Sequence, residues 1–329
     1  MIRDGIINVN KPQNMTSHDV VRDLRRALGM KKIGHTGTLD PMATGVLPVC
    51  LGSATRITEY LDLDFKKYRC TMKLGMVTDT QDIWGEVIEE FSTDNVTEEK
   101  IREAFSDFHG EIMQKPPMYS AVRVNGRRLY DYARAGEEVE VKSRKIYING
   151  IDIENIDMDS KEITFTVECS KGTYIRTICQ DVGIALGTGA TMTALERIAR
   201  GNFTIENAVD LEDIKKMSEE DVDKILLPCE YPLTHFGKAV LSPELGKKFV
   251  DGWHIRMGEC DIPVRPEYES KDAPFEIRDE YRKAYNMFKE DPESPTGETF
   301  LGVAFYNRQY KKLVADKVFF RGQADNGNI

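Results

Sequence analysis

Residues 31–52 have the sequence KKIGHTGTLDPMATGVLPVCLG, in which a single carboxylate, Asp40, lies among glycines, prolines and small or apolar residues. On spacing alone, Asp followed by Pro is a common helix start, with Asp at the N-cap. The apolar neighbours favour a second interpretation, because a carboxylate in surroundings poor in water needs a partner to stay charged. The small residues beside Asp40 also leave room for a flat ligand. No GK[ST] follows, which excludes a P-loop.

The net charge of −10 over 329 residues is unevenly distributed. Residues 205–225 and 266–298 each carry an excess of five negative charges, so the remainder of the chain is neutral overall. Residues 22–32 and 115–146 each carry an excess of four positive charges. Because polyanions respond to local potential, the two basic segments keep a nucleic-acid partner open despite the acidic total.

Strand and helix signals alternate without a regular βαβ repeat. A strand is expected at Ile6, Ile7 and Val9, followed by a helix capped at Thr16 or Ser17. A further helix is expected within residues 96–108, with its cap at Thr97. We therefore predict an α+β fold with a mixed, largely antiparallel central sheet flanked by helices.

A domain boundary is predicted near residue 236, after the first acidic segment. Residues 1–236 then form the main domain, and residues 237–322 form a small β-rich domain because they contain short strand-like runs with turn signals. The acidic insertion at 266–298 interrupts the second domain, and its EDPESPTGE stretch predicts a solvated loop. Residues 323–329 are a tail.

Several classes of protein and site are disfavoured. No apolar run reaches the roughly 18 residues of a membrane span, and the N-terminus lacks the form of a signal peptide, so we expect a cytoplasmic protein. The six cysteines form no CxxC pair and are expected to be free thiols. The five histidines are scattered, so neither a metal site nor a cofactor motif is expected.

The segment GHTGTLDPMATGVLPVCLGSATR, at residues 34–56, resembles the central motif of the bacterial TruB family, GHxGTLDPxAxGxLxxxxGxATK. Four further segments resemble the family in its order: NVNKPQNMTSHDVV, KKYRCTMKLGMVTDTQDIWG, PPMYSAVRVNGRRLYDYARAGEEV and CSKGTYIRTICQDVGIALG. The resemblance covers residues 5–235 and implies the pseudouridine synthase fold. Residues 237–322 are similar to the family's small RNA-binding PUA domain, although the acidic insertion departs from it.

This resemblance implies a tRNA uridine-55 pseudouridine synthase that needs no cofactor. Asp40 falls on the family's catalytic aspartate, Arg176 on the arginine that pairs with it, and Tyr68 on the active-site tyrosine. A guanidinium keeps a desolvated carboxylate ionised. Tyrosine can stack on uracil and take part in proton transfer at C5. For Arg176 alone the other interpretation is a surface arginine, and for Tyr68 it is core packing.

Further positions follow from the same resemblance. His35, Tyr174 and Ile198 match substrate-contacting positions, the last usually Leu in the family, and Lys11 is a candidate phosphate contact. Residues 118–145 correspond to the family's thumb, a basic insertion that closes over the T-arm of tRNA. The arginines of the thumb expected to bind RNA are Arg123, Arg127, Arg128 and Arg134.

Two rival functions remain open at this point. A non-catalytic tRNA-binding or tRNA-folding protein could use the same scaffold, although retention of Asp40, Tyr68 and Arg176 together disfavours it. A metal-dependent hydrolase could use His35 and Asp40, but the ligand set is thin. We expect a monomer that binds tRNA, with no membrane association and no obligate protein partner.

Overall fold

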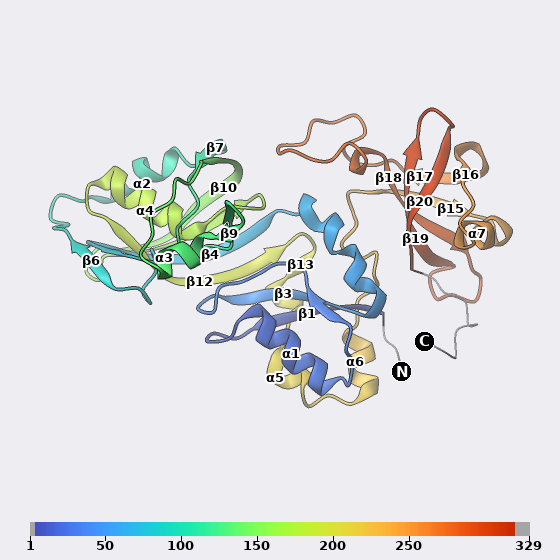
Figure 1. The fold of residues 1–329 in the computed structure, drawn as a ribbon, viewed down its shortest axis with the longest axis horizontal. Helices are drawn as coiled ribbons and strands as arrows, with labels where there is room; N and C mark the ends of the chain where they lie inside the picture. Colours follow the sequence, from blue (N-terminus) through green and yellow to red (C-terminus); the bar gives the residue numbers. More distant parts are fainter. Residues whose placement is uncertain (1–3, 320–329) are drawn as a thin grey trace.

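The computed structural model describes residues 4–319, which form two main β-sheets with helices packed around them (Figure 1). The predicted tail at 323–329 lies outside the described residues. The larger sheet has ten strands, two of which lie off its main row. The row runs β14 (Val209–Asp210), β1 (Gly5–Lys11), β3 (Thr44–Leu51), β12 (Ala190–Arg200), β4 (Lys66–Leu74), β11 (Glu162–Cys169), β10 (Arg144–Asp157) and β7 (Gly110–Gln114), while β2 (Ile33–His35) pairs with β3 and β13 (Phe203–Thr204) with β12.

Neighbouring strands of this sheet are antiparallel except at β1–β14 and β12–β3. Along β4, the even-numbered residues from 68 to 74 are buried, whereas Arg69 and Lys73 are exposed. Successive side chains of a strand point to opposite faces, so one face of the sheet carries the core and the other is polar here. The predicted α+β class with a mixed, largely antiparallel sheet is confirmed.

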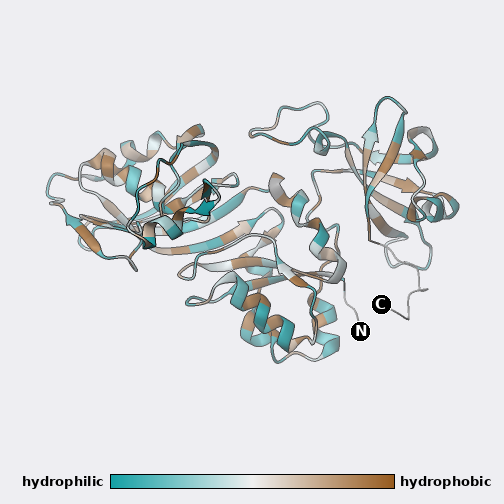
Figure 2. Ribbon diagram, viewed as in Figure 1, coloured by the Kyte–Doolittle hydropathy of each residue, from teal (hydrophilic) through white to brown (hydrophobic). Residues whose placement is uncertain are grey.

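The helices pack in two groups (Figure 1). Thr16 caps the first helix by accepting a hydrogen bond from the backbone of Asp19, whose side chain bonds back to Thr16, and Thr97 caps the second, so both predicted helix starts are confirmed. One group is α2 (Glu98–Ser106) with α4 (Ile175–Leu186), and the other is α1 (Ser17–Ala27), α5 (Leu211–Ile214) and α6 (Glu219–Ile225). Figure 2 shows hydrophobic and hydrophilic residues alternating along these helices. Among residues 4–319, no helix has the length and hydrophobicity needed to cross a bilayer.

The second sheet has six strands and forms the small β-rich C-terminal part that the sequence predicts. Its strands run in the order β16 (Ile255–Arg256), β20 (Lys312–Val318), β19 (Glu298–Asn307), β18 (Ala284–Glu290), β15 (Gly237–Leu241) and β17 (Asp261–Val264), and α7 (Pro243–Val250) packs on it. All pairs are antiparallel except β15–β18. Its core includes Phe249, Tyr285 and Leu301, all fully buried.

The acidic insertion at 266–298 is more ordered than the sequence indicates. The EDPESPTGE stretch is confirmed as a solvated loop, which closes the hairpin between β18 and β19. Residues 284–290, however, form the central strand β18, with Ala284, Tyr285 and Met287 buried. Acidic residues on both sides obscure this short apolar run. The remaining part, residues 266–280, is an irregular loop that reaches back towards the larger sheet (Figure 1) and is called the docked loop below.

One hydrophobic cluster joins the two sheets. Tyr60, in the 3₁₀ segment η1 (Gly52–Leu63), packs edge-on against Phe236 and Tyr281, with ring centroids 5.4 and 5.8 Å away. The Tyr281 hydroxyl donates a hydrogen bond of 2.8 Å to the carbonyl of Glu59. The C-terminal sheet is therefore held to the main one by buried aromatic contact.

Candidate active site

Asp40 lies in a turn between β2 and β3, and does not begin a helix. The backbone N–H of Ala43 donates to the Asp40 carbonyl at 3.0 Å, which closes a four-residue turn with Pro41 at its second position. The helix-start interpretation of this Asp-Pro pair is therefore wrong. Leu39 and Met42 on either side are buried, which anchors the turn in the core.

The Asp40 carboxylate is only partly shielded from solvent. Its side chain is 44% exposed, although its apolar neighbours are buried. The expectation of surroundings poor in water is therefore wrong for the carboxylate itself. The backbone is anchored by the core while the carboxylate is partly exposed, which leaves it accessible to an incoming ligand.

Two buried arginines of β12 hold the ends of the loop that carries Asp40. Arg197 is fully buried; its Nε donates to the carbonyl of Val46 at 2.6 Å and its Nη2 to that of Gly37 at 3.4 Å. Arg200 donates to the carbonyl and hydroxyl of Thr36. Because these guanidinium groups replace water as partners of the loop carbonyls, the turn keeps a fixed position.

Gly45 is required for this close approach. It has φ +96°, and a Cβ atom there would clash with the backbone carbonyl of Arg197. We expect Gly45→Ala to lower the free energy of unfolding by at least about 2 kcal/mol, because backbone strain and a clash with rigid main chain add. Gly252→Ala is the matched control, since Gly252 has φ +88° with open space around it, and should cost about 1 kcal/mol. Urea unfolding measures both; equal losses would contradict the role of the Arg197 contact.

Arg176 brings the turn together with two other parts of the chain. It lies in the first turn of α4, and its side chain is 7% exposed. Its Nη2 lies 3.0 Å from Asp40 Oδ2, and its Nη1 lies 3.4 Å from Asp82 Oδ2. The same nitrogens donate to the carbonyls of Thr80 and Tyr119, each at 3.0 Å. The predicted pairing of Asp40 with Arg176 is confirmed as a contact.

Asp82 is a site residue that the sequence reasoning missed. It precedes β6 (Val87–Glu90), in the hairpin that β6 forms with β5 (Met76–Thr78), and it is largely buried. One carboxylate oxygen accepts hydrogen bonds from the Thr80 hydroxyl and the Trp84 backbone, and the other faces Arg176. The TDTQD segment carried a possible signal, because two aspartates flank polar residues in an otherwise strand-like region.

Tyr68 lies in one row of residues across the sheet. It pairs with Arg197, which pairs with Gly45, which pairs with Lys11. Burial raises the pKa of Tyr68, and the nearby positive charge of Arg197 opposes this shift only partly, so the phenol is protonated at neutral pH. Arg197 thus links Tyr68 to the loop that carries Asp40. The Nη1 of Arg197 is buried with no hydrogen-bond partner among residues 4–319.

Lys11 does not fit the predicted role of a phosphate contact. It is fully buried, and its ammonium donates to the carbonyls of Pro12, Met15 and Pro41 at 2.8, 2.6 and 3.4 Å. Burial lowers its pKa from 10.5 to about 8, against the opposing charge of Asp40. A lysine enclosed by three carbonyls cannot reach a phosphate, so Lys11 instead supports the backbone next to Asp40.

His35 lies at the end of β2, and its Nδ1 is buried with no hydrogen-bond partner within the described part of the chain. Burial, followed by the charges of Arg197, His18 and Arg200, lowers its pKa. The ring is therefore neutral at pH 7, and surrounding cations disfavour a metal ion on it. Among residues 4–319, no group of three or more His, Cys, Asp or Glu side chains could hold a metal.

This burial predicts a specific pH dependence of stability. Below pH 6.5 the unfolded chain binds a proton at His35 more readily than the folded chain, so the free energy of unfolding falls as the pH drops. We expect the wild-type protein to lose more stability between pH 7 and pH 5 than His35→Gln does. Urea unfolding at pH 7, 6 and 5 measures this difference. Parallel pH curves for the two proteins would contradict it.

Tyr174 and Ile198, the other two positions predicted to contact the substrate, lie in different structural surroundings from His35. The buried side chain of Gln114 makes two hydrogen bonds with the backbone of Tyr174. It accepts one from the N–H of Tyr174 at 2.8 Å and donates one to the carbonyl of Tyr174 at 3.0 Å. Ile198 is the extra residue of a β-bulge, because Arg197 and Ala199 pair with consecutive residues of β4. The register therefore leaves Ile198 outside the row of Tyr68. Leu195, two residues before Arg197, packs against the same core as Tyr68.

The thumb, residues 118–145, is a short hairpin followed by a helix. It contains β8 (Arg123–Val124), β9 (Arg127–Arg128) and α3 (Leu129–Arg134). The guanidinium groups of Arg128 and Arg134 lie over the ring of Tyr130, at 5.6 and 5.4 Å from its centroid. These two arginines and Arg123 are exposed, whereas Arg127 is paired with Glu137 at 2.8 Å.

Models of two consecutive parts of one family match this chain. The model described as TruB family pseudouridylate synthase (N-terminal domain) matches residues 25–175, and that of the tRNA pseudouridylate synthase B C-terminal domain matches residues 176–234. The chain belongs to the TruB family. The two matches meet between Ile175 and Arg176, so in this TruB chain the Asp40–Arg176 contact joins regions described by different models.

Curated relatives and solved structures agree with this membership. A protein named tRNA pseudouridine synthase B from Clostridium perfringens is 50% identical over 250 residues, covering 76% of this chain and 83% of the relative. One of the same name from Clostridium novyi is 41% identical over 310 residues, covering 94% and 98%. A chain in a crystal structure of a Cbf5-Nop10-Gar1 complex has TM-score 0.71 and 26% identity, covering 97% of this TruB chain and 85% of its own. The similarity therefore extends over both sheets.

Proposed function

We propose that this protein converts uridine 55 in the T-loop of tRNA to pseudouridine. Its family consists of pseudouridylate synthases, and relatives of 41–50% identity are named tRNA pseudouridine synthase B. The observation that carries the proposal is the contact of the half-exposed Asp40 carboxylate with the buried Arg176. This pair offers an accessible carboxylate held beside a buried guanidinium.

The reaction fits what such a site can supply. The bond between N1 of uracil and C1′ of ribose breaks, and a bond between C5 and C1′ forms. The proton on C5 is removed, and N1 gains one, so the product is an isomer of the substrate. No electron or external group is transferred, and the reaction needs no cofactor. Asp40 can add to the base or the sugar, or remove a proton from the ribose.

Arg176 holds the Asp40 carboxylate in a fixed direction. Its guanidinium is held by Asp82 and by the carbonyls of Thr80 and Tyr119, so the donor facing Asp40 has little freedom. Tyr68, protonated at neutral pH, is proposed to stack on the extruded uracil and to assist proton transfer at C5. His35 and Tyr174 are proposed to contact the same nucleotide.

The target base lies within a folded RNA loop, so it must be flipped out to reach Asp40. The exposed Arg123, Arg128 and Arg134 of the thumb are proposed to hold the T-arm through its phosphates. We further propose that residues 1–236 act as the catalytic domain and residues 237–322 as an RNA-binding domain. The protein is proposed to act in the cytoplasm as a monomer.

The test is incubation with an unmodified tRNA transcript, followed by site-resolved mapping of pseudouridine. We expect modification at position 55 and at no other uridine. A transcript with cytidine at position 55 is the matched control and should remain unmodified. Absence of pseudouridine from the first transcript, or its presence at another position, would overturn the proposal.

A further inference from the structure

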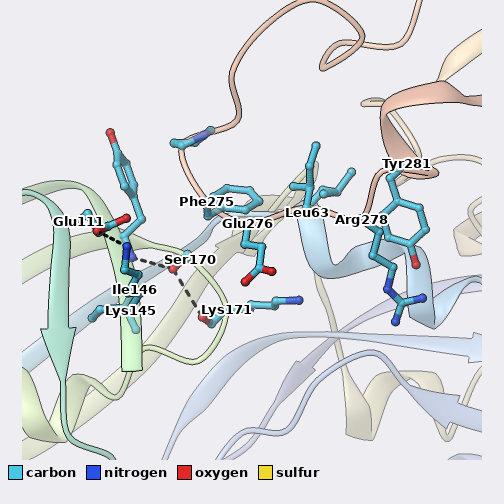
Figure 3. A pocket seen from close by; sticks show the side chains of 13 residues that line it. Leu63, Glu111, Lys145, Ile146, Ser170, Lys171, Phe275, Glu276, Arg278 and Tyr281 are labelled. Carbon is cyan, nitrogen blue, oxygen red and sulfur yellow. Dashed lines mark hydrogen bonds and ion pairs between the residues drawn. The ribbon is translucent and has the colours of Figure 1, made fainter. Parts of the chain in front are cut away.

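A cavity of about 660 Å³ lies between the larger sheet and the docked loop, and neither Asp40 nor Arg176 lines it. Figure 3 shows side chains projecting into it from both sides. On the side of the larger sheet, β10 and the turn at residues 170–171 form the wall. On the other side, the wall comes from the docked loop and the neighbouring Tyr281. A volume of this size is typical of small-molecule and cofactor sites.

The docked loop is fixed in place by aromatic packing. Phe275 meets Phe65 edge-on, with ring centroids 5.2 Å apart, and Phe65 in turn lies 6.2 Å from Tyr147. Phe275 and Ile277 pack against the cluster that joins the two sheets. Tyr147 and Phe275 therefore place two aromatic rings at the wall of the cavity, where each retains part of its surface accessible.

The charges at the cavity favour an anion slightly. Three cationic side chains line it, Lys145, Lys171 and Arg278, against the two carboxylates of Glu111 and Glu276. Lys145 is paired with Glu111 at 2.9 Å. Figure 3 shows Lys171 and Glu276 projecting into the middle of the cavity. The docked loop is acidic overall, and at the cavity it contributes one cation, one carboxylate and an aromatic ring.

One segment of the chain contributes both to the cavity and to the candidate active site. Lys171 precedes Arg176 by five positions, in the turn that leads into α4. Ser170 locks this turn to β10, because its N–H donates to the Tyr147 carbonyl at 2.8 Å and its hydroxyl accepts from the Tyr147 N–H at 2.9 Å. Lys171 and Tyr174 therefore lie in one short turn that links the wall of the cavity to the start of α4.

We propose that this cavity binds one nucleotide of the RNA substrate other than the flipped uridine. The base lies against the rings of Tyr147 and Phe275, and the phosphate lies between Lys171 and Arg278. Aromatic rings beside cations are the usual combination for unpaired nucleotides, because every base has a face that can stack and every linkage carries a charge. This inference rests on the proposed function for the identity of the RNA.

The test measures the dissociation constant for unmodified tRNA as a function of salt. Lys171→Ala combined with Arg278→Ala should raise that constant about tenfold at moderate salt and flatten the slope of log affinity against log salt by about 0.7, because one phosphate contact is lost. Both side chains are exposed, so folding should be unaffected and is checked by urea unfolding. Lys216→Ala is the matched control, because it removes an exposed charge just after α5, outside the cavity, the thumb and the C-terminal sheet. It should leave affinity and slope unchanged.

A second variant is expected to change the dissociation constant for tRNA in the opposite direction. Glu276→Gln removes a carboxylate from the cavity and should lower the dissociation constant at least about twofold, since repulsion of the phosphate is lost. Unchanged affinity and slope in the double variant, or weaker binding by Glu276→Gln, would overturn the proposal. The two proposals can also fail separately. If the wild-type protein forms no pseudouridine, but the double variant binds tRNA more weakly than the wild type does, the proposed function is refuted and the cavity assignment stands.

Discussion

Asp40→Asn is expected to lower the single-turnover rate of pseudouridine formation by at least about 10⁴-fold, because the amide can neither act as a nucleophile nor accept a proton at neutral pH. The side chain keeps its shape and can still face Arg176. The dissociation constant for tRNA should therefore change less than about threefold. Rapid mixing with saturating enzyme measures the rate, and filter binding measures the affinity.

Asp152→Asn is the matched control for this substitution. Asp152 is an exposed carboxylate on β10, distant in sequence from the turn, and the same chemical change there should leave the rate unaltered. Full turnover by Asp40→Asn would refute the catalytic assignment. It would also revive the alternative of a protein that binds or folds tRNA without modifying it.

Arg176→Lys is expected to have the second largest effect. The guanidinium of Arg176 reaches Asp40, Asp82 and two carbonyls at once, and an ammonium cannot reproduce this planar arrangement. We expect the single-turnover rate to fall about 10²–10³-fold, because Asp40 loses its fixed partner. The free energy of unfolding should fall by about 2–4 kcal/mol, because the largely buried Asp82 keeps a charge with a poorer partner.

Arg69→Lys provides a close comparison on the same sheet. Arg69 also contacts two carboxylates, Glu154 at 3.0 Å and Glu196 at 3.3 Å, but it is 47% exposed. Pairs this exposed contribute little, so this substitution should cost less than about 1 kcal/mol and leave the rate unchanged. Equal effects of the two substitutions would show that burial and the link to Asp82 do not matter.

Local signals predicted much of the fold. The helix starts at Thr16 and Thr97 follow from capping residues, and the strand expected at Ile6, Ile7 and Val9 lies within β1. The contact between Asp40 and Arg176 followed from the family resemblance alone. Nothing in the spacing of the residues indicates that two side chains so far apart in the chain would meet.

The missed features depend on long-range packing. Arg197 donates a hydrogen bond to the carbonyl of Val46, which is 151 positions away in the chain. An arginine in a strand-like segment gives no local signal that it is buried or which groups it contacts. Lys11 was predicted to contact a phosphate, and only the three carbonyls that the fold places around its ammonium explain its burial. Asp82 acquires its importance from a guanidinium on another element.

The carbonyl of Tyr119, at the base of the thumb, accepts a hydrogen bond from the same Nη2 atom that faces Asp40. A single nitrogen thus touches both the segment that would grip the RNA and the acid that would act on it. If the thumb moves away, the guanidinium of Arg176 loses its hydrogen bond to the Tyr119 carbonyl. The position of the group that contacts Asp40 then changes directly, because no other side chain lies between them. RNA binding by the thumb and the proposed reaction at Asp40 would therefore be coupled. A variant that displaces the thumb should lower the reaction rate even when Asp40 and Arg176 are unchanged.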